Sequence, residues 1–255
     1  MTTYPVSELL RNSPAMDERQ VRVELAAALR MAARLGMHEG ICNHFSVRLP
    51  GPSWRFLMNP RGRHWSRMRA SDLVVIDETG RTVEGTGEPL RTGFTIHSRI
   101  HMLHPGAGVV FHTHMPYATA LTAIKGGRLL QVHQNAARFL DRCAYDDEFA
   151  GLAFDPSEGE RMAEVFGDKS VLFLGNHGVV VVADTIAEGF DDLFYLERAC
   201  EIQVLAMSTG RPLAEIPPEV ARETAAQFAG RRGSAEAHLA EVMAILDEAE
   251  PAYRD

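Results

Sequence analysis

Hydrophobic and polar positions follow two different periods along the chain. Near the N-terminus, apolar residues recur at helical spacing over residues 16–37 and the pattern ends near Gly36, which predicts an amphipathic helix. The middle of the chain instead contains short apolar runs that proline and glycine interrupt, a pattern typical of strands. We therefore expect strands at residues 45–49, 54–58, 73–76, 108–113, 128–133, 171–174 and 179–182.

Helical patterns lie between these strands and after them. Residues 92–103 and a segment from about Tyr117 have helical character, and Thr185-x-x-Glu188 has the form of a capping box that opens a helix to about Ser208. Two more helices are expected at residues 218–229 and 234–249. Strands in the middle of the chain with helices on both sides predict an α/β protein, a three-layer α/β/α sandwich around a mixed sheet.

Composition narrows the class of protein. The 255 residues are 45% hydrophobic and 24% charged, and the net charge of -8 argues against general binding to nucleic acid. No apolar run approaches the roughly 20 residues that span a bilayer, and no basic region is followed by an apolar one near Met1. Neither a disulfide framework nor a cysteine zinc site is indicated by Cys42, Cys143 and Cys200. We expect a cytoplasmic protein without nucleic-acid or membrane partners.

A histidine pair follows the strand predicted at residues 108–113. Side chains two apart on a strand point the same way, so His112 and His114 can present both imidazoles to one ion. His177, in a glycine-bounded turn after another predicted strand, offers a third imidazole. Three neutral histidine ligands leave positions open for water and substrate. The pattern therefore favours a catalytic metal site, although a chance His-x-His on a surface strand is the alternative.

Five short motifs occur in an order that resembles the class II aldolase/adducin family. They are NHFSVR at residues 43–48, NPRG at 59–62, SDLVVID at 71–77, HTH at 112–114 and GNHG at 175–178, and the resemblance covers roughly residues 17–210. It implies a single domain over residues 1–255, with a core at about 17–210, a helical extension at about 211–255 and a largely antiparallel sheet. It also implies one divalent ion per subunit (zinc, manganese or iron) on His112, His114 and His177, and a homotetramer with active sites between subunits.

The chain departs from the aldolases of this family at their proton-transfer groups. By that resemblance, the acid/base glutamate falls at Gly93, which has no side chain, and a tyrosine falls at Gln134. Loss of such groups costs an aldolase roughly 10²–10⁴-fold each. His133, next to Gln134, is the best remaining candidate for the catalytic proton donor; a buried histidine with a purely structural partner is the alternative.

The family's phosphate-binding positions have also changed. They fall at Arg61, Arg91, Thr92 and His44, with Asn43 adjacent, so we take these five residues as candidates for substrate binding. Two arginines near the site would suit recognition of a substrate carboxylate, because paired hydrogen bonds give both energy and geometry.

These departures resemble the decarboxylases of the family. We expect a carbon–carbon lyase that decarboxylates, or cleaves by a retro-aldol reaction, a small anionic hydroxy or oxo acid through a metal-stabilised enediolate. The alternatives are an iron-dependent oxygenase on the same three histidines and a non-catalytic module like the adducin head, which lacks the complete histidine set. His97 and His101, four apart on a predicted helix, fit either a second metal site or a helix face turned toward the first site or toward a partner subunit. The substrate and the native metal stay open.

Overall fold

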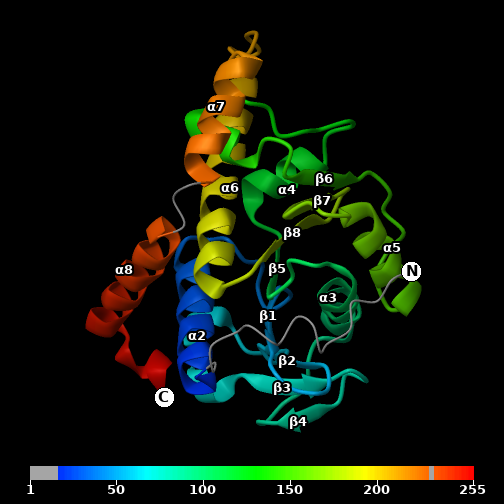
Figure 1. The fold of residues 1–255 in the computed structure, drawn as a ribbon, viewed down its shortest axis with the longest axis vertical. Coiled ribbons are helices and arrows are strands. Elements are labelled where there is room, and N and C mark those ends of the chain that lie inside the picture. Colours follow the sequence, from blue (N-terminus) through cyan, green and yellow to red (C-terminus); the bar gives the residue numbers. More distant parts are fainter. Residues whose placement is uncertain (1–16, 230–232) are drawn as a thin grey trace.

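The computed structural model describes residues 17–229 and 233–255, which form an eight-stranded sheet with helices on both faces (Figure 1). The strands are β1 (His44–Leu49), β2 (Arg55–Met58), β3 (Val74–Asp77), β4 (Thr82–Glu84), β5 (Val109–Thr113), β6 (Cys143–Asp146), β7 (Val171–Leu174) and β8 (Gly178–Ala183). The α-helices are α2 (Glu18–Arg34), α3 (Arg91–Leu103), α4 (Pro116–Thr122), α5 (Pro156–Phe166), α6 (Ile186–Met207), α7 (Pro218–Ala229) and α8 (Gly233–Ala249). Short 3₁₀ helices are η1 (Trp65–Arg67), η2 (Ala70–Asp72), η3 (Gln134–Phe139) and η4 (Pro251–Arg254).

The strand order is β4-β3-β2-β1-β5-β8-β7-β6. Every neighbouring pair is antiparallel except β6 and β7, which run parallel. This confirms the predicted α/β/α sandwich with a mixed, largely antiparallel sheet. Strand β5 is central and pairs with β1 on one side and with β8 on the other.

Alternation along β5 divides the interior into two layers. Phe111 belongs to the core that includes residues of α2, α6 and α8, whereas Val110 belongs to the core that includes residues of α3 and α5. Figure 1 shows these two sets of helices on opposite sides of the sheet. Because side chains on a strand alternate between faces, the even positions of β5 and of β1 lie on the α3 side. His112, at an even position, is therefore expected on the same side as α3.

The prediction of a strand at residues 128–133 is wrong, because these residues form no strand in the structure. Its backbone groups are bound by side chains and by a distant loop instead of a neighbouring strand: the amides of Leu129 and Leu130 donate to Tyr145 Oη and Gln203 Oε1. The carbonyl oxygen of Gln131 accepts a hydrogen bond of 2.7 Å from the amide of Ile216. Residues 128–133 therefore form a half-buried connection in which only Leu129 is buried.

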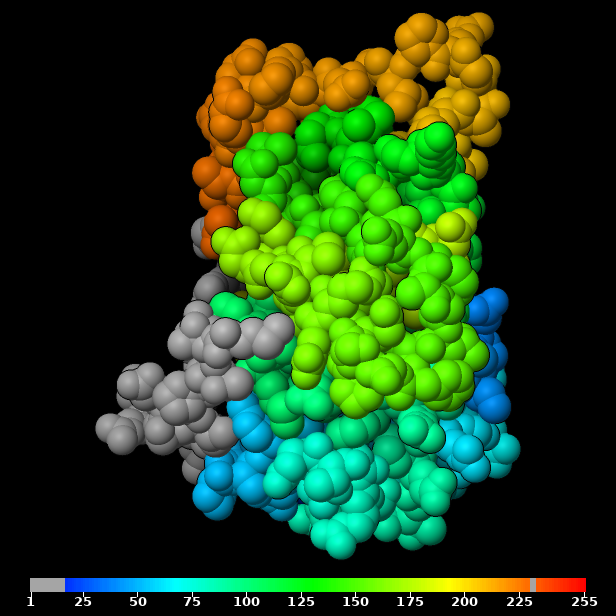
Figure 2. Space-filling model, turned by 90° about the vertical axis from the view of Figure 1, so that its right-hand side faces the viewer, coloured from blue at the N-terminus to red at the C-terminus, as the bar shows by residue number. Residues whose placement is uncertain are grey.

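Three elements were not predicted, namely β4, β6 and α5. Figure 2 shows the surface on the α3 side of the sheet, and α5 with the segment before it, in yellow-green, covers the middle of this surface. Helix α5 begins at Asp155, whose side chain accepts a hydrogen bond from the amide of Ser157, and it packs on α3. Its apolar residues Met162, Ala163 and Phe166 are buried and close the second core. The sequence pattern of this helix is weak, because it begins with a proline and contains few apolar residues.

The C-terminal helices differ in how they pack. Leu239, Val242 and Leu246 of α8 are buried in the core shared with α2 and α6, so this apolar stripe is covered within the chain. Helix α7 packs on η3 and buries only Ala221. The division of the chain into a core and a helical extension stays a prediction.

Candidate active site

Three histidines converge where β5 ends and β8 begins. His112 is in β5, His114 follows it, and His177 is in the turn between β7 and β8. One ring nitrogen from each lies within 4.8 Å of the others. Within residues 17–229 and 233–255 this is the one group of three or more such side chains close enough to share an ion. The structure thus brings the three predicted ligands together.

Close backbone packing holds the turn against β5. An added Cβ at Gly178 would lie 2.5 Å from the carbonyl oxygen of Thr113, so a side chain there would force the turn away. Asn176 adopts a φ of 54°, in the left-handed region that asparagine tolerates better than most residues. The sequence Gly-Asn-His-Gly therefore lets the turn approach β5 closely enough for His177 to meet the strand pair.

Hydrogen bonds at the outer ring nitrogens fix which atoms face one another. His112 Nδ1 donates to the carbonyl oxygen of Val179 at 3.0 Å, and His114 Nδ1 lies 2.6 Å from a carboxylate oxygen of Glu39. In neutral His112 the Nε2 atom then carries a lone pair, and it faces His114 Nε2 at 3.1 Å. A cation bound between these two atoms would accept that lone pair. Such outer partners of metal-binding histidines orient the ring and raise its basicity.

Burial keeps these imidazoles in the form that binds metals. The pKa of His112 is lowered well below its usual range by desolvation, and further by His177, His44, His114 and His97. Desolvation, followed by His114, lowers the pKa of His177 to about 4. Metal ligation requires neutral imidazole. His112 and His177 are thus held in the metal-binding form, and the three convergent ring nitrogens fit a divalent ion.

Glu39 was not predicted as a site residue from the sequence. It lies in the loop before β1, and its amide donates to Asn43 Oδ1 at 2.6 Å. Asn43 is 2% exposed, and its Nδ2 has no partner in the described chain. Asn43 thus holds the loop that brings the Glu39 carboxylate to His114. An isolated glutamate 75 positions away from His114 carries no pattern that could have identified it.

The candidate arginines lie on two connected segments, the loop after β2 and the start of α3. The amide of Arg61, after β2, donates to the carbonyl oxygen of Glu88 at 2.9 Å, shortly before Arg91 begins α3. Both arginine side chains are exposed, and Arg61 lies 4.0 Å from the Glu88 carboxylate. Thr92 is the second residue of α3, where backbone N–H groups are unpaired. Neither arginine is buried against a structural partner, so both are available to a ligand.

His44 occupies the space that a side chain at position 93 would need. An added Cβ at Gly93 would lie 2.6 Å from His44 Cδ2 and 2.8 Å from Nε2. The His44 ring also stacks on His112, with ring centroids 4.9 Å apart. The absence of a side chain at Gly93 and the presence of an imidazole at position 44 are therefore one structural feature.

Behind His44 lies a buried row of polar side chains, which we call the histidine row: His44, His97, Ser46 and His101. His44 Nδ1 lies 2.8 Å from His97 Nε2, and His97 Nδ1 lies 2.6 Å from Ser46 Oγ. Ser46 Oγ is also 2.7 Å from His101 Nε2, and His101 Nδ1 donates to the carbonyl oxygen of Ala107. The face of α3 that carries His97 and His101 is turned toward the first site, and neither belongs to a second metal group in the described residues.

Burial of the histidine row predicts a dependence of stability on pH. Desolvation lowers the pKa of His101 from 6.5 to about 3, so the unfolded chain binds a proton that the folded chain rejects between these values. Stability is therefore complete above 6.5, and it falls as pH decreases from 6.5 toward 3, by up to about 1.4 kcal/mol per pH unit for one histidine. Urea unfolding of EDTA-treated protein at several pH values measures the slope. His101→Gln should flatten it, whereas His64→Gln, at an exposed position, should not.

His133, the predicted proton donor, is half-buried just before η3, and its Nδ1 has no partner in the described chain. No ring contact or hydrogen bond within residues 17–229 and 233–255 joins it to the three histidines. The catalytic role of His133 stays a prediction, because this residue does not contact the three histidines within the single chain.

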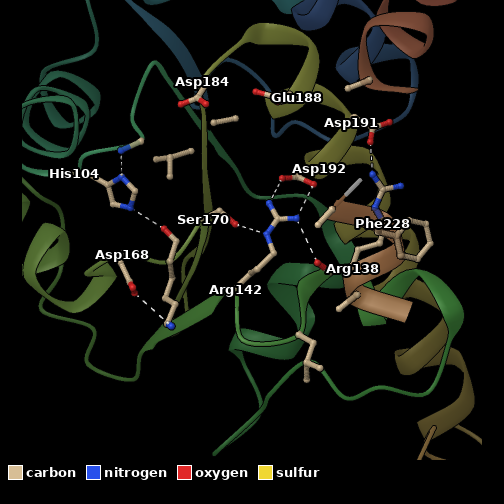
Figure 3. A pocket seen from close by; sticks show the side chains of 18 of the residues that line it. His104, Arg138, Arg142, Asp168, Ser170, Asp184, Glu188, Asp191, Asp192 and Phe228 are labelled. Carbon is tan, nitrogen blue, oxygen red and sulfur yellow. Dashed lines mark hydrogen bonds and ion pairs between the residues drawn. The ribbon is translucent and has the colours of Figure 1, made fainter. Parts of the chain in front are cut away.

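A separate pocket of about 730 Å³ lies at the opposite end of β8 (Figure 3). Figure 3 shows Arg142 directed at Asp192 and Ser170, and Arg138 directed at Asp191. Lys169 lies 3.4 Å from Asp168. Each of these cations already has an acidic partner, so this pocket is a poor match for an anionic substrate.

Comparison with known proteins agrees with this geometry. Residues 23–204 match the family described as the class II aldolase and adducin N-terminal domain. The chain belongs to this family. A protein of Caulobacter vibrioides, provisionally named a class 2 aldolase, is 39% identical over 215 residues, which cover 84% of this chain and 83% of the relative.

A second curated protein and a solved structure are also similar to this chain. Decarboxylase NovR of Streptomyces niveus is 30% identical over 235 residues, 89% of this chain and 86% of that protein. The crystal structure of an aldolase II superfamily protein from Pseudomonas syringae superposes with a TM-score of 0.87 at 38% identity, covering 96% of this chain and 98% of that one. Among the described residues, no helix is both long and apolar enough to cross a membrane.

Proposed function

We propose that this class II aldolase family member is a metal-dependent carbon–carbon lyase that decarboxylates a small anionic hydroxy or oxo acid, or cleaves it by a retro-aldol reaction. The observation that carries the proposal is the combination of three convergent histidines with His44 in the space beside Gly93. A divalent ion on the three imidazoles would supply an electrophilic centre, and a side chain at position 93 would collide with the His44 ring. A reaction whose leaving group is CO₂ needs an electron acceptor more than it needs a side-chain carboxylate.

The chain's own residues divide the remaining work. A divalent zinc, manganese or iron ion on His112, His114 and His177 would supply a Lewis acid that accepts electron density as the carbon–carbon bond breaks. Arg61, in the loop after β2, and Arg91, at the start of α3, are both exposed and would bind a substrate carboxylate. The buried floor of the site, formed by His44 and the sheet beneath it, keeps water from that side. Retention of all three histidines supports an enzyme over a scaffold like adducin.

A side-by-side assay tests this function. Protein loaded with Mn²⁺ or Zn²⁺ is incubated with aromatic hydroxy-dicarboxylates, aliphatic hydroxy acids and sugar phosphates, while CO₂ release, aldehyde formation and O₂ consumption are followed separately. We expect CO₂ from at least one acid. Rapid cleavage of a sugar phosphate without CO₂ from any acid would contradict the proposal, and O₂ consumption with iron alone would favour the oxygenase alternative.

Arg91→Ala should weaken binding of the acid substrate by about 1.5–3 kcal/mol, because a charge-assisted hydrogen bond to a carboxylate is lost. The expected change is in KM or in the dissociation constant, with metal content unchanged. Arg99→Ala is a suitable control, since Arg99 lies further along α3 and faces Glu160 at 3.7 Å. Equal affinity in Arg91→Ala and the parent would remove Arg91 from the site.

We also propose that the protein is a homotetramer with active sites at subunit contacts. The support is the exposed position of Arg61 and Arg91, and helix α7, which buries only Ala221 within its own chain. Light scattering at micromolar concentration should give about four times the 28.2 kDa chain mass. A stable monomer under those conditions would show that the site is complete within one chain.

A further inference from the structure

The direction of each hydrogen bond in the histidine row is set at its far end. The carbonyl oxygen of Ala107 can only accept, so His101 Nδ1, 2.8 Å away, carries a proton. In neutral His101 the Nε2 atom is then an acceptor, and Ser46 Oγ, 2.7 Å away, donates to it. The single hydroxyl proton of Ser46 is thereby committed, so the hydroxyl accepts from its other neighbour.

The same logic continues to the active site. Ser46 Oγ accepts from His97 Nδ1 at 2.6 Å, which leaves His97 Nε2 as an acceptor. His44 Nδ1, 2.8 Å from that atom, must then be the donor. Neutral imidazole carries one proton, so the second nitrogen of His44, Nε2, is unprotonated. It has no hydrogen-bond partner within the described residues, and it lies beside Gly93 and the stacked His112 ring.

Burial holds the row in this neutral state. His44, His97 and His101 are between 1% and 3% exposed, and Ser46 is fully buried. Their hydrogen bonds join only one another and the backbone, so no carboxylate is present to stabilise a positive charge. An unpaired buried charge is strongly unfavourable. A single backbone carbonyl therefore determines the tautomer of an active-site histidine across three intervening side chains.

We propose that His44 presents an unprotonated Nε2 to the substrate, and that His97, Ser46 and His101 are positioning residues that fix this tautomer. This inference rests on the proposed lyase function and narrows its substrate class. A lone pair accepts a hydrogen bond from a hydroxyl group and repels the oxygens of a phosphate ester or a carboxylate. The substrate group that faces His44 is therefore a hydroxyl, and the anionic group of the acid lies elsewhere, toward the exposed arginines.

Neutron diffraction from deuterated crystals of the unaltered protein tests the tautomer directly. We expect deuterium on Nδ1 of His44, His97 and His101, the Ser46 deuteroxyl directed at His101, and no deuterium on His44 Nε2. Deuterium on His44 Nε2, with or without deuterium on Nδ1, would overturn the inference. This measurement needs neither turnover nor a variant that folds.

A pair of probes tests the consequence for binding. Glycolohydroxamate and its phosphate ester share one metal-chelating group but end in a hydroxyl and in a phosphate, respectively. Calorimetry on Mn²⁺-loaded protein gives the ratio of their dissociation constants. In His44→Asn, whose amide can donate, this ratio should shift roughly tenfold or more toward the phosphate ester. A ratio that stays within about twofold of the parent value would overturn the assignment.

The positioning role has its own variants. Ser46→Ala cuts the row between His97 and His101, so the ratio should shift in the same direction as in His44→Asn, and Ser46→Thr should restore the parent value. Ser98→Ala, also at a buried serine on the α3 side, is the matched control and should leave the ratio unchanged. Identical shifts in Ser46→Ala and Ser98→Ala would show a merely structural effect. Failure of every acid to release CO₂ would reject the lyase function while these ratios still stand.

Discussion

Replacement of Gly93 by alanine is expected to destabilise the protein by about 1–3 kcal/mol, because a new methyl group would overlap the His44 ring. The ideal Cβ position lies 2.6–2.9 Å from three atoms of that ring, and the ring itself is held by His97 and stacked on His112. A larger side chain, in Gly93→Glu, should cost more. Urea denaturation of the purified variants measures the change in unfolding free energy.

A double-mutant cycle separates this overlap from a general effect of losing glycine. His44→Asn shortens the side chain that the new group meets, so Gly93→Ala should cost less in the His44→Asn background than in the parent. Gly106→Ala is the matched control, because its added methyl would lie 3.6 Å from the nearest atom, at ordinary contact distance. Additive effects of Gly93→Ala and His44→Asn would contradict direct contact between the two positions.

Replacement of His112 by alanine is expected to abolish stoichiometric binding of a divalent metal. His112 is 1% exposed at the centre of the group, and its ring centroid lies 4.9 Å and 4.7 Å from those of His114 and His177. Loss of an outer partner such as Glu39 typically costs 10–100-fold in affinity, so loss of a ligand should cost more than about a hundredfold. Metal analysis after dialysis, together with titration by Zn²⁺ or Mn²⁺, measures both quantities.

His104→Gln serves as the control for this substitution. His104 lies at the other pocket, where its Nε2 is 2.7 Å from the carbonyl oxygen of Lys169, and glutamine can keep that hydrogen bond. It should retain one metal per chain. Glu39→Gln should fall between the two, with metal bound but weakened. Parent-like affinity in His112→Ala would show that the three histidines are not the ligands.

The elements around the site could be predicted from sequence because their signals are local. The strands before and after the histidines were found to within one residue at β5, β7 and β8, since each is a continuous apolar run with glycine nearby. The run at residues 128–133 contains only three apolar residues, and its backbone is bound by other groups, such as the amide of Ile216, which bonds to the carbonyl oxygen of Gln131.

The histidine row shows what sequence patterns leave out. Ser46 and His97 are 51 positions apart, and their contact exists because β1 lies under α3 in the folded chain. The spacing of His97 and His101 identified the face of α3 that carries them. It could not identify the tautomer of His44, which depends on the carbonyl oxygen of Ala107. The Glu39 contact with His114 is of the same kind. Contacts between residues far apart in the chain could not be predicted from the sequence, whereas residues within one motif could be.

The pairing of β5 with β8 has a consequence for the order of assembly. His112 and His177 come from segments that meet only after residues 115–176 have folded back, with His112 opposite Val180 in the antiparallel register. An ion held by both segments would behave as a reversible cross-link of the native chain, absent from the unfolded one. Free metal would then raise the melting temperature by mass action, because it binds the folded chain and not the unfolded one.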